Sequence, residues 1–381
     1  MTLKDFLHTY SSNTLAASGN QTLFYSDEQK YTGRIFYKIR TGGRYNYAFI
    51  YSDVIDSTFD DGSVSRAGTL CGGYTIHSLR AGVCRRADFE GFNKAEMLIE
   101  MSDTPKKNAL CVSGFTDITF DGHTSKVIDA GAYALTDPIS LSFESGDFLC
   151  LEITYSGKQL PYHNETIISA YLKNGDAWQE GKTMPFPAII GCDRPVAKRI
   201  AYIGDSITQG SGTPRDSYTH WCAVVSEKLD ESIAAWNMGY GFARALDAAS
   251  DGSWLYKAKQ NDAVCVCFGV NDIFRERTAA EIKLDLKIIV GRLLDNGIKV
   301  LVQTPPPFNY LGKYKDEWEK VCDFILGELP DMGCEVFDNR HILGKKDSIN
   351  MAEYGDHPNS RGCKLWGEAL YPAVNELLET V

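Results

Sequence analysis

One serine of this sequence stands where an α/β enzyme would carry a nucleophile. Residues 199–203 form an apolar, β-branched run of strand length that breaks abruptly into Gly204-Asp205-Ser206. In open parallel sheets, ligands and reactive groups gather at the carboxyl ends of the strands. A serine hydroxyl attacks a substrate only when a base lies within hydrogen-bond reach and donors await the oxyanion. Considered alone, this stretch is explained better as an ordinary strand-to-loop turn.

Three later segments carry groups of the types that such a serine needs. Gly239 and Gly241 follow one strand-like run, and Asn271 follows the next. Glycine lets a backbone N–H approach a ligand closely, and an asparagine amide is a neutral donor of the kind found in oxyanion holes. His357 stands in a loop directly before the last helical pattern, and Pro358 fixes the turn after it. Each residue also has a structural explanation, as a turn or solvated loop residue, but together they predict one site of nucleophilic catalysis.

The second half of the chain supplies the elements that must position these groups. Strand-like runs alternate with helical patterns, which predicts a parallel sheet covered on both faces. Thr278 and Glu281 have capping-box spacing at the start of one helix. The expected strands are 200–203, 233–236, 263–268, 299–303 and 334–337, and the expected helices are 218–229, 253–259, 279–295, 314–329 and 360–380.

The first half has a different pattern, with short apolar or alternating segments separated by Gly/Asp turns. This pattern predicts an all-β sandwich of the jelly-roll kind over residues 1–195, followed by an α/β domain over residues 196–381. The alternating aromatics of 45–51 are interpreted as core and cross-strand pairs rather than as a sugar-stacking surface. Residues 156–197 are rich in Gly and Pro and are expected to form an irregular connection. The expected strands are 34–39, 45–51, 94–101, 109–112, 139–143 and 148–155.

Composition restricts the partners that the protein is expected to have. The 381 residues carry a formal net charge of −11, which argues against a nucleic-acid partner. No segment has the length and apolarity of a signal peptide or a membrane span. The eleven cysteines are scattered, their number is odd, and no Cys-x-x-Cys occurs. We therefore expect a reduced, cytoplasmic protein that uses cysteine as a small apolar residue and holds no metal through it.

The ordered motifs closely resemble those of the SGNH (GDSL-type) hydrolase superfamily. The resemblance covers residues 199–367 and rests on four blocks, which are Gly204-Asp205-Ser206, Asn237-x-Gly239-x-Gly241, Gly269-x-Asn271-Asp272 and His357-Pro358-Asn359. A β-sandwich followed by such a domain is also similar to the arrangement of carbohydrate esterases of family 2, which are acetylxylan esterase-like. The resemblance implies a flavodoxin-like, three-layer α/β fold for the second domain.

The resemblance also implies a function, that of a serine esterase acting on short acyl esters, with acetyl esters of carbohydrates foremost. Ser206 would be the nucleophile and His357 the general base and acid. The backbone N–H of Ser206, that of Gly239 or Gly241, and the Asn271 side chain would bind the oxyanion. No metal or organic cofactor is needed for this chemistry.

Two positions depart from the family pattern. The family usually has an aspartate three residues before the histidine, where this chain has Tyr354. Asp356 is a candidate for the third member of a triad, and a backbone carbonyl that orients His357 in a dyad is an equal alternative. The family also places its oxyanion glycine three residues after the first glycine of the second block, where this chain has Phe242. Gly241 is therefore our choice for that role, with Gly239 behind it.

Other functions remain open at this point. The same site with a longer apolar pocket would suit a lysophospholipase or thioesterase. A glycan-binding protein with a degenerate esterase domain is an alternative of another class. Residues 304–310, rich in proline and aromatics, form either a wall of the acyl pocket or a rigid loop. The expected partner is a small-molecule or oligosaccharide acyl ester, with no nucleic acid and no membrane, and the oligomeric state is left undetermined.

Overall fold

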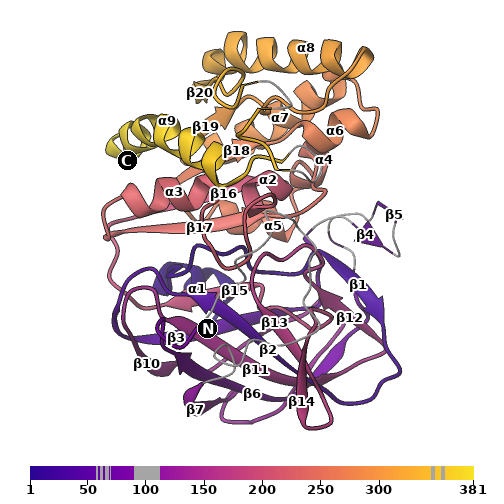
Figure 1. Ribbon diagram of the computed structural model, residues 1–381, viewed down its shortest axis with the longest axis vertical. Coiled ribbons are helices and arrows are strands. Elements are labelled where there is room, and N and C mark those ends of the chain that lie inside the picture. The colour runs from indigo at the N-terminus through magenta and orange to yellow at the C-terminus, as the bar shows by residue number, and fades with distance from the viewer. Residues whose placement is uncertain are drawn as a thin grey trace. The chain divides into compact units, whose positions relative to one another are not determined.

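The computed structural model describes residues 1–56, 59–60, 63–64, 68, 70–89, 112–344, 348–352 and 357–381. The chain divides into two compact units (Figure 1). The described residues up to Pro195 belong to the first unit, which also includes Arg215–Ser217. The second unit contains Val196–Pro214 and Tyr218–Val381.

A parallel sheet forms the centre of the second unit. Its described strands run in the order β17-β16-β18-β19-β20 and are parallel throughout. This is the 2-1-3-4-5 order of flavodoxin-like folds, in which the direction of winding switches between β16 and β18. The predicted α/β fold is confirmed, and each predicted strand has a counterpart. The strands are β16 (Lys198–Gly204), β17 (Ile233–Gly239), β18 (Ala263–Cys267), β19 (Lys299–Gln303) and β20 (Glu335–Phe337).

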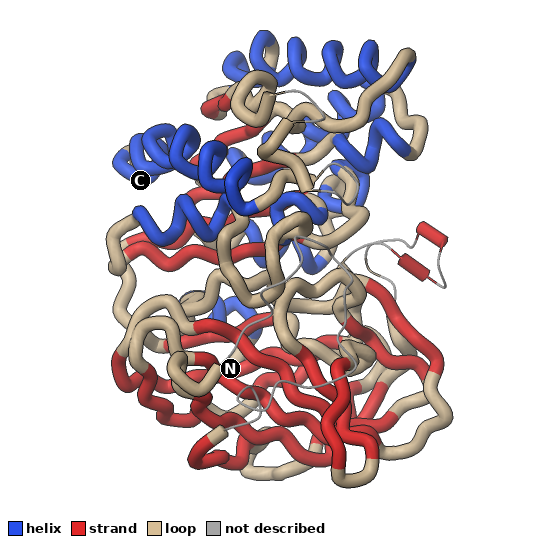
Figure 2. Tube along the Cα trace, in the orientation of Figure 1, coloured by secondary structure: helices blue, strands red, loops and turns tan. Residues whose placement is uncertain are grey.

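Helices cover both faces of this sheet because both faces are apolar (Figure 2). Ala201 and Ile203 point into a core shared with α7, while Tyr202 points the other way and meets Trp221 of α3 at a ring distance of 5.3 Å. The Trp221 ring stacks in turn on Trp366 of α9. The helices are α2 (Ser206–Gln209), α3 (Trp221–Lys228), α4 (Ala245–Ala248), α5 (Ser253–Ala258), α6 (Val270–Phe274), α7 (Ala279–Leu294), α8 (Lys313–Gly327) and α9 (Ser360–Glu379), with a 3-10 turn η2 (Leu329–Met332) after α8.

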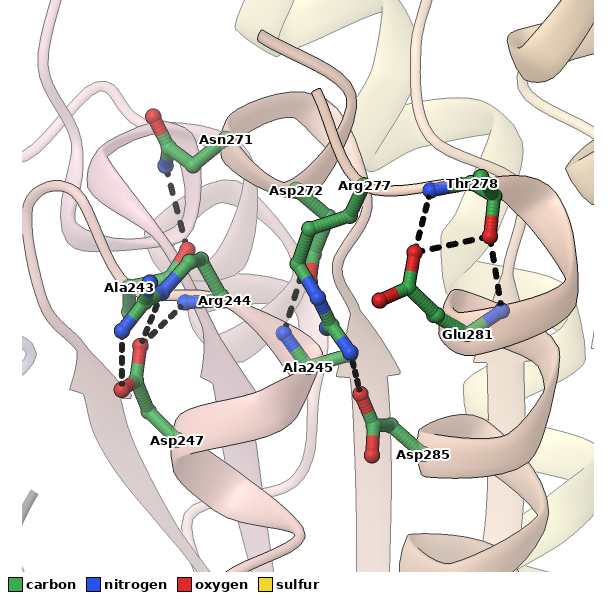
Figure 3. Close-up of polar contacts among 10 residues, drawn as sticks. All are labelled: Ala243, Arg244, Ala245, Asp247, Asn271, Asp272, Arg277, Thr278, Glu281 and Asp285. Carbon is green, nitrogen blue, oxygen red and sulfur yellow. Dashed lines mark hydrogen bonds and ion pairs between the residues drawn. The ribbon is translucent and has the colours of Figure 1, made fainter. Parts of the chain in front are cut away.

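The predicted capping box at the start of α7 is confirmed. The Thr278 hydroxyl accepts a hydrogen bond from the Glu281 N–H, and the Glu281 carboxylate accepts one from the Thr278 N–H at 2.8 Å (Figure 3). The two side chains thus satisfy backbone donors that the first helical turn leaves without a partner.

The first unit is built mainly from antiparallel strands, as the short alternating segments predicted. Among its described strand pairs, only β1 with β4 is parallel. The three sheets follow the paths β12-β1-β4-β5, β10-β3-β15 and β14-β13-β2-β11-β6-β7. The unit begins with helix α1 (Leu3–Thr9), and its strands are β1 (Thr22–Tyr25), β2 (Tyr31–Lys38), β3 (Gly43–Ser52), β4 (Phe59–Asp60), β5 (Ser63–Val64), β6 (Tyr74–Cys84), β7 (Ser113–Ile118), β8 (Lys126–Ile128), β9 (Tyr133–Leu135), β10 (Ile139–Phe143), β11 (Phe148–Ser156), β12 (Gln159–Tyr162), β13 (Ala170–Asn174), β14 (Ala177–Glu180) and β15 (Ile189–Cys192).

The expectation that residues 156–197 form an irregular connection is wrong. They carry four strands, β12 to β15, and β13 and β15 pair with β2 and β3 from much earlier in the chain. Such long-range pairing stabilises strands whose local sequence, broken by Gly and Pro, does not favour them. The interpretation of the aromatics in β3 is confirmed for Tyr47 and Tyr51, which are fully buried. The strands expected at 94–101 and 109–112 fall at least partly on 90–111, outside the described residues.

Ten of the eleven cysteines are free thiols in buried positions, and the eleventh, Cys111, lies outside the described residues. This agrees with their use as small apolar residues. Within the part of the chain that the structure describes, no helix has the length and apolarity needed to cross a membrane.

Candidate active site

The turn after β16 presents Ser206 at the carboxyl edge of the sheet. Asp205 is the N-cap of α2, and its carboxylate accepts a hydrogen bond of 3.0 Å from the Ile207 N–H. Ser206 is therefore the first residue of a short helix, and the left-handed Gly210 ends that helix one turn later. Because the cap is made by Asp205, the Ser206 hydroxyl is left for another partner.

That partner is His357. The Ser206 Oγ and the His357 Nε2 lie 2.8 Å apart, and both residues are more than nine-tenths buried. His357 stands in the loop that leads into α9, whose N-cap is Asn359. The Asn359 side chain accepts from the Gly362 N–H and donates to the carbonyl of Met351, which fixes the loop on both sides of the histidine. The structure thus brings together two predicted residues that are 151 positions apart in the sequence.

Gly212 forms the support behind His357, a role that the sequence reasoning missed. Its φ is +94°, and a Cβ at this position would lie 2.7 Å from the His357 Cβ and 2.6 Å from the Pro358 carbonyl oxygen. A side chain here would therefore be strained and would push the histidine loop away. The positions of glycine in Gly210-Ser-Gly212 were the available signal, but only the fold shows what the second glycine contacts.

We expect Gly212→Ala to lower kcat for ester hydrolysis by at least about tenfold, since a displacement of about 1 Å in a reacting group costs on the order of 10²-fold. Gly297→Ala is the matched control, because Gly297 also has a positive φ, +76°, but a Cβ added there would meet nothing within 4 Å. The control should lose about 1 kcal/mol of stability with an unchanged kcat. Thermal unfolding and steady-state kinetics measure both effects. Equal kcat values in the two variants would contradict this role of Gly212.

Asn237 and Gly239 fasten the end of β17 to α2. The Asn237 amide donates to the Thr208 carbonyl at 3.1 Å, and its oxygen accepts from the Gly239 N–H at 2.9 Å. A Cβ on Gly239 would lie 2.3 Å from the Gln209 backbone nitrogen. Gly239 therefore permits the close approach of α2, and its N–H is engaged within its own strand end. Both facts favour a packing role for Gly239 over that of an oxyanion donor.

The N–H of Gly241, our first choice as a backbone oxyanion donor, also has a partner inside the protein. It donates to the side-chain oxygen of Gln209 at 2.7 Å. Gln209 is fully buried at the end of α2, so this bond links the loop after β17 directly to the helix that carries Ser206. Oxyanion binding by Gly241 requires this bond to be broken or shared.

Asn271 lies in the first turn of α6, after β18. Its side-chain nitrogen donates a hydrogen bond to the Ala243 carbonyl at 3.1 Å (Figure 3). Gly204 in β16 is directly opposite Gly239 in β17 and Cys267 in β18. The loops that carry Ser206, Gly241 and Asn271 therefore leave the sheet at the same edge.

Two buried carboxyl groups influence each other beside this edge. The pKa of Asp205 is raised to about 7, chiefly by burial and also by the nearby charge of Asp272, while the Ile207 N–H opposes the shift. Burial likewise raises the pKa of Asp272 to about 6, against the N–H of Ala245 and the charge of Arg277. The helix starts of α2 and α6 are thus coupled electrostatically.

An aromatic group adjoins the histidine. The Phe308 ring meets the His357 ring edge-on at 5.4 Å, and Phe274 of α6 contacts Phe308 at 5.6 Å. Phe274 also stacks on Tyr310, so part of the 304–310 segment is packed into the domain. Phe308 itself is half-buried, which leaves part of its ring exposed next to the candidate base.

Residues 202–365 match the model of the GDSL-like Lipase/Acylhydrolase family. The second unit is a GDSL-like lipase/acylhydrolase domain. No sequence match to a functionally curated protein was found. Similar solved structures include a putative lipolytic protein of the G-D-S-L family from Desulfitobacterium hafniense, at 21% identity and a TM-score of 0.41, covering 46% of this chain and 98% of that one. They also include a family two carbohydrate esterase from Clostridium thermocellum in complex with cellohexaose, at 12% identity and a TM-score of 0.43, covering 96% of this chain and 95% of that one.

In the second block, the residue that stands where the family has a glycine has a backbone conformation that suits glycine. Phe242, at the position where the family places a glycine, has a φ of +62°. This left-handed conformation is uncommon for a residue with a side chain and is the one that glycine adopts readily. The remaining predicted site residue of the domain, Asp356, lies with Tyr354 outside the described residues.

Proposed function

We propose that the protein is a serine esterase that removes short acyl groups, acetyl foremost, from a carbohydrate. The observation that carries this proposal is the 2.8 Å separation between the Ser206 Oγ and the His357 Nε2 at the carboxyl edge of a flavodoxin-like sheet. The distance is that of a nucleophile and the base that activates it. The match of this domain to a lipase/acylhydrolase family supports the reaction class.

The proposed reaction has two stages. His357 Nε2 takes the hydroxyl proton as Ser206 Oγ attacks the acyl carbonyl carbon, and the resulting oxyanion is bound by the Ser206 N–H, a backbone N–H of the loop after β17, and the Asn271 amide. His357 then gives the proton to the oxygen of the leaving alcohol as the carbon–oxygen bond breaks. In the second stage, water, deprotonated by His357, attacks the acyl-enzyme and releases the carboxylic acid and free Ser206.

The group that orients His357 is proposed in two alternative forms. Asp356 is the candidate for an acidic third member, and a backbone carbonyl near His357 is the alternative. A side chain adjacent in sequence is poorly placed to orient its neighbour's ring, so we give Asp356 no preference over the carbonyl.

Phe308 supports a cyclic, amphipathic alcohol as the leaving group. Because His357 delivers its proton to the leaving oxygen, the alcohol lies on the side of the site where the base stands, and Phe308 contacts that base. A partly exposed aromatic ring at this place offers an apolar face to the C–H face of a sugar ring. A long acyl chain would instead need an extended apolar pocket.

Hydrolysis of p-nitrophenyl acetate, butyrate and octanoate tests the proposal. We expect kcat/KM to be highest for acetate and to fall by at least about tenfold to octanoate, since each methylene that a pocket does not fit costs about 1–3 kcal/mol. Release of acetate from acetylated xylo-oligosaccharides then tests the alcohol part. A preference for octanoate would favour the lysophospholipase or thioesterase alternative, and a folded protein that hydrolyses none of the esters would contradict the esterase proposal.

A further inference from the structure

Two adjacent residues of α6 hold the segment 243–245 from both ends. The Asn271 amide donates to the Ala243 carbonyl at 3.1 Å, and the Asp272 carboxylate accepts from the Ala245 N–H at 2.9 Å (Figure 3). This segment directly continues the loop of Gly239 to Phe242. The start of α6 therefore fixes the backbone that follows the loop of Gly239 to Phe242.

Asp272 is itself held in a chain of buried charges. Arg277 donates to Asp272 Oδ1 at 2.7 Å through Nη1, and its Nη2 lies 2.6 Å from Asp285 Oδ2 in α7 (Figure 3). The Asp272 side chain is fully buried and that of Asp285 is 8% exposed. The Arg277 N–H also donates to the Asp272 carbonyl at 3.1 Å. A single guanidinium thus joins the α6 carboxylate to α7, which is a rigid helix of 16 residues.

A contribution to folding stability alone does not explain well why Asp272, Arg277 and Asp285 form this linked set of charges. Buried ion pairs lose so much hydration that well-packed apolar residues of similar volume often stabilise a fold as well or better. An arginine that bridges two carboxylates contributes geometric definition instead, because the donors of its planar guanidinium point in fixed directions. Because Arg277 holds the Asp272 carboxylate in place, the Ala245 N–H that donates to this carboxylate is also held in place.

The position of segment 243–245 sets the direction of the Asn271 amide. The two N–H bonds of an asparagine amide lie in one plane at a fixed angle. Once one of them points to the Ala243 carbonyl, the direction of the other is determined. The Ala243 N–H donates to the Tyr240 carbonyl at 3.2 Å, so the same residue is also tied to the loop after β17. A shift of Ala243 would therefore turn the donor that we propose for the oxyanion.

We propose that Asp272 and Arg277 are positioning residues for catalysis, which hold segment 243–245 so that the Ala243 carbonyl aims the Asn271 amide at the oxyanion. This inference rests on the proposed esterase function. Neither residue touches the substrate, and both act through Asn271. Their effect should therefore appear in the transition state and disappear when Asn271 is removed.

A nearby ion pair provides a matched control. Arg244, in the same segment, lies 3.0 Å from Asp247 through Nη2, three residues along the chain (Figure 3). This pair closes the start of α4 on itself and makes no link to α6. Arg244→Gln therefore removes an arginine–aspartate pair from the segment without releasing Asp272.

A double-mutant cycle tests the proposal with p-nitrophenyl acetate as substrate. We expect Arg277→Gln to lower kcat by about 10- to 100-fold with KM within about twofold, because only the transition state loses a well-aimed donor. In the Asn271→Ala background, Arg277→Gln should cause no further loss of kcat, as expected for residues that act as one unit. Arg277→Lys should recover part of the loss, and Arg244→Gln should stay within about threefold of the wild type.

Three results would overturn the inference. The first is an unchanged kcat in Arg277→Gln, and the second is a kcat of the double variant that shows the losses of Arg277→Gln and Asn271→Ala multiplied together. The third is a loss of kcat in Arg244→Gln as large as that in Arg277→Gln. If Arg277→Gln does not fold, the same cycle is run with Asp272→Asn, which keeps the side-chain shape but removes the charge and replaces one of the two accepting oxygens by an NH2 donor. A wild-type protein with no activity on any ester would overturn the proposed function and this inference together. An active wild type with independent losses would overturn this inference alone.

Discussion

Replacing Ser206 by alanine should lower kcat/KM for p-nitrophenyl acetate by about 10⁴- to 10⁶-fold, the loss that removal of a serine nucleophile or its histidine base causes. The same loss is expected for His357→Ala, since the Oγ and the Nε2 form one hydrogen-bonded unit at 2.8 Å. The double variant should be no less active than either single variant, because residues that act as a unit do not contribute independently.

The structure indicates that Ser206→Ala leaves the fold intact. The cap of α2 is made by the Asp205 carboxylate and not by Ser206. Ser226→Ala is the matched control, since Ser226 is buried in α3 of the same domain, where its hydroxyl donates to the Cys222 carbonyl at 2.7 Å. That control should keep its activity. Labelling by a fluorophosphonate, followed by peptide mass spectrometry, should place the adduct on Ser206 and show none in His357→Ala. A folded Ser206→Ala variant that retains turnover would contradict the assignment of the nucleophile.

The sequence was sufficient to predict the α/β fold of the second unit, because the local patterns that mark its strands and helices agree with the way these elements pack in the folded domain. Strands β16 to β19 contain apolar runs that are mostly buried, as strands covered on both faces require, whereas the edge strand β20 is three residues long and partly exposed. The capping box of Thr278 and Glu281 marks a helix start by local hydrogen bonds alone. In the first unit, strands such as β13 and β15 are stabilised by partners more than 130 residues away, and no local pattern contains that information.

The candidate site could be predicted in its residue types but not in its network of contacts. Glycine, asparagine and serine at strand ends, and a histidine in the loop before the last helix, are visible in the sequence. The engagement of the Gly241 N–H by Gln209, or the support of His357 by Gly212, depends on loops that meet only in the folded chain. Asp272 belongs to the third motif block, but its link through Arg277 to Asp285 is not visible in the sequence, since charged residues at such spacings are common on exposed helices.

Replacing Asn271 by alanine should lower kcat for p-nitrophenyl acetate by about 10²- to 10³-fold with little change in KM, the effect of removing one side-chain donor from an oxyanion hole. The reason is that such a donor binds the developing negative charge more strongly than the ground-state carbonyl. The amide of Asn271 already donates to the Ala243 carbonyl, so the variant also loses that link, and its thermal unfolding must be measured alongside the kinetics.

Asn261→Ala separates the two effects of the Asn271 variant. Asn261 is also a buried asparagine of the same domain, and its amide donates to the carbonyls of Lys257 and Ala258 at the end of α5. Its loss should cost about 1 kcal/mol of stability, as for a typical hydrogen bond, without a comparable loss of kcat. If Asn271→Ala loses activity only in proportion to its stability, as Asn261→Ala does, then Asn271 is a structural residue of the 243–245 segment. A large loss of kcat in a variant as stable as the control would instead support Asn271 as the oxyanion donor, because the ground-state fold would then be unaffected while the transition state is not.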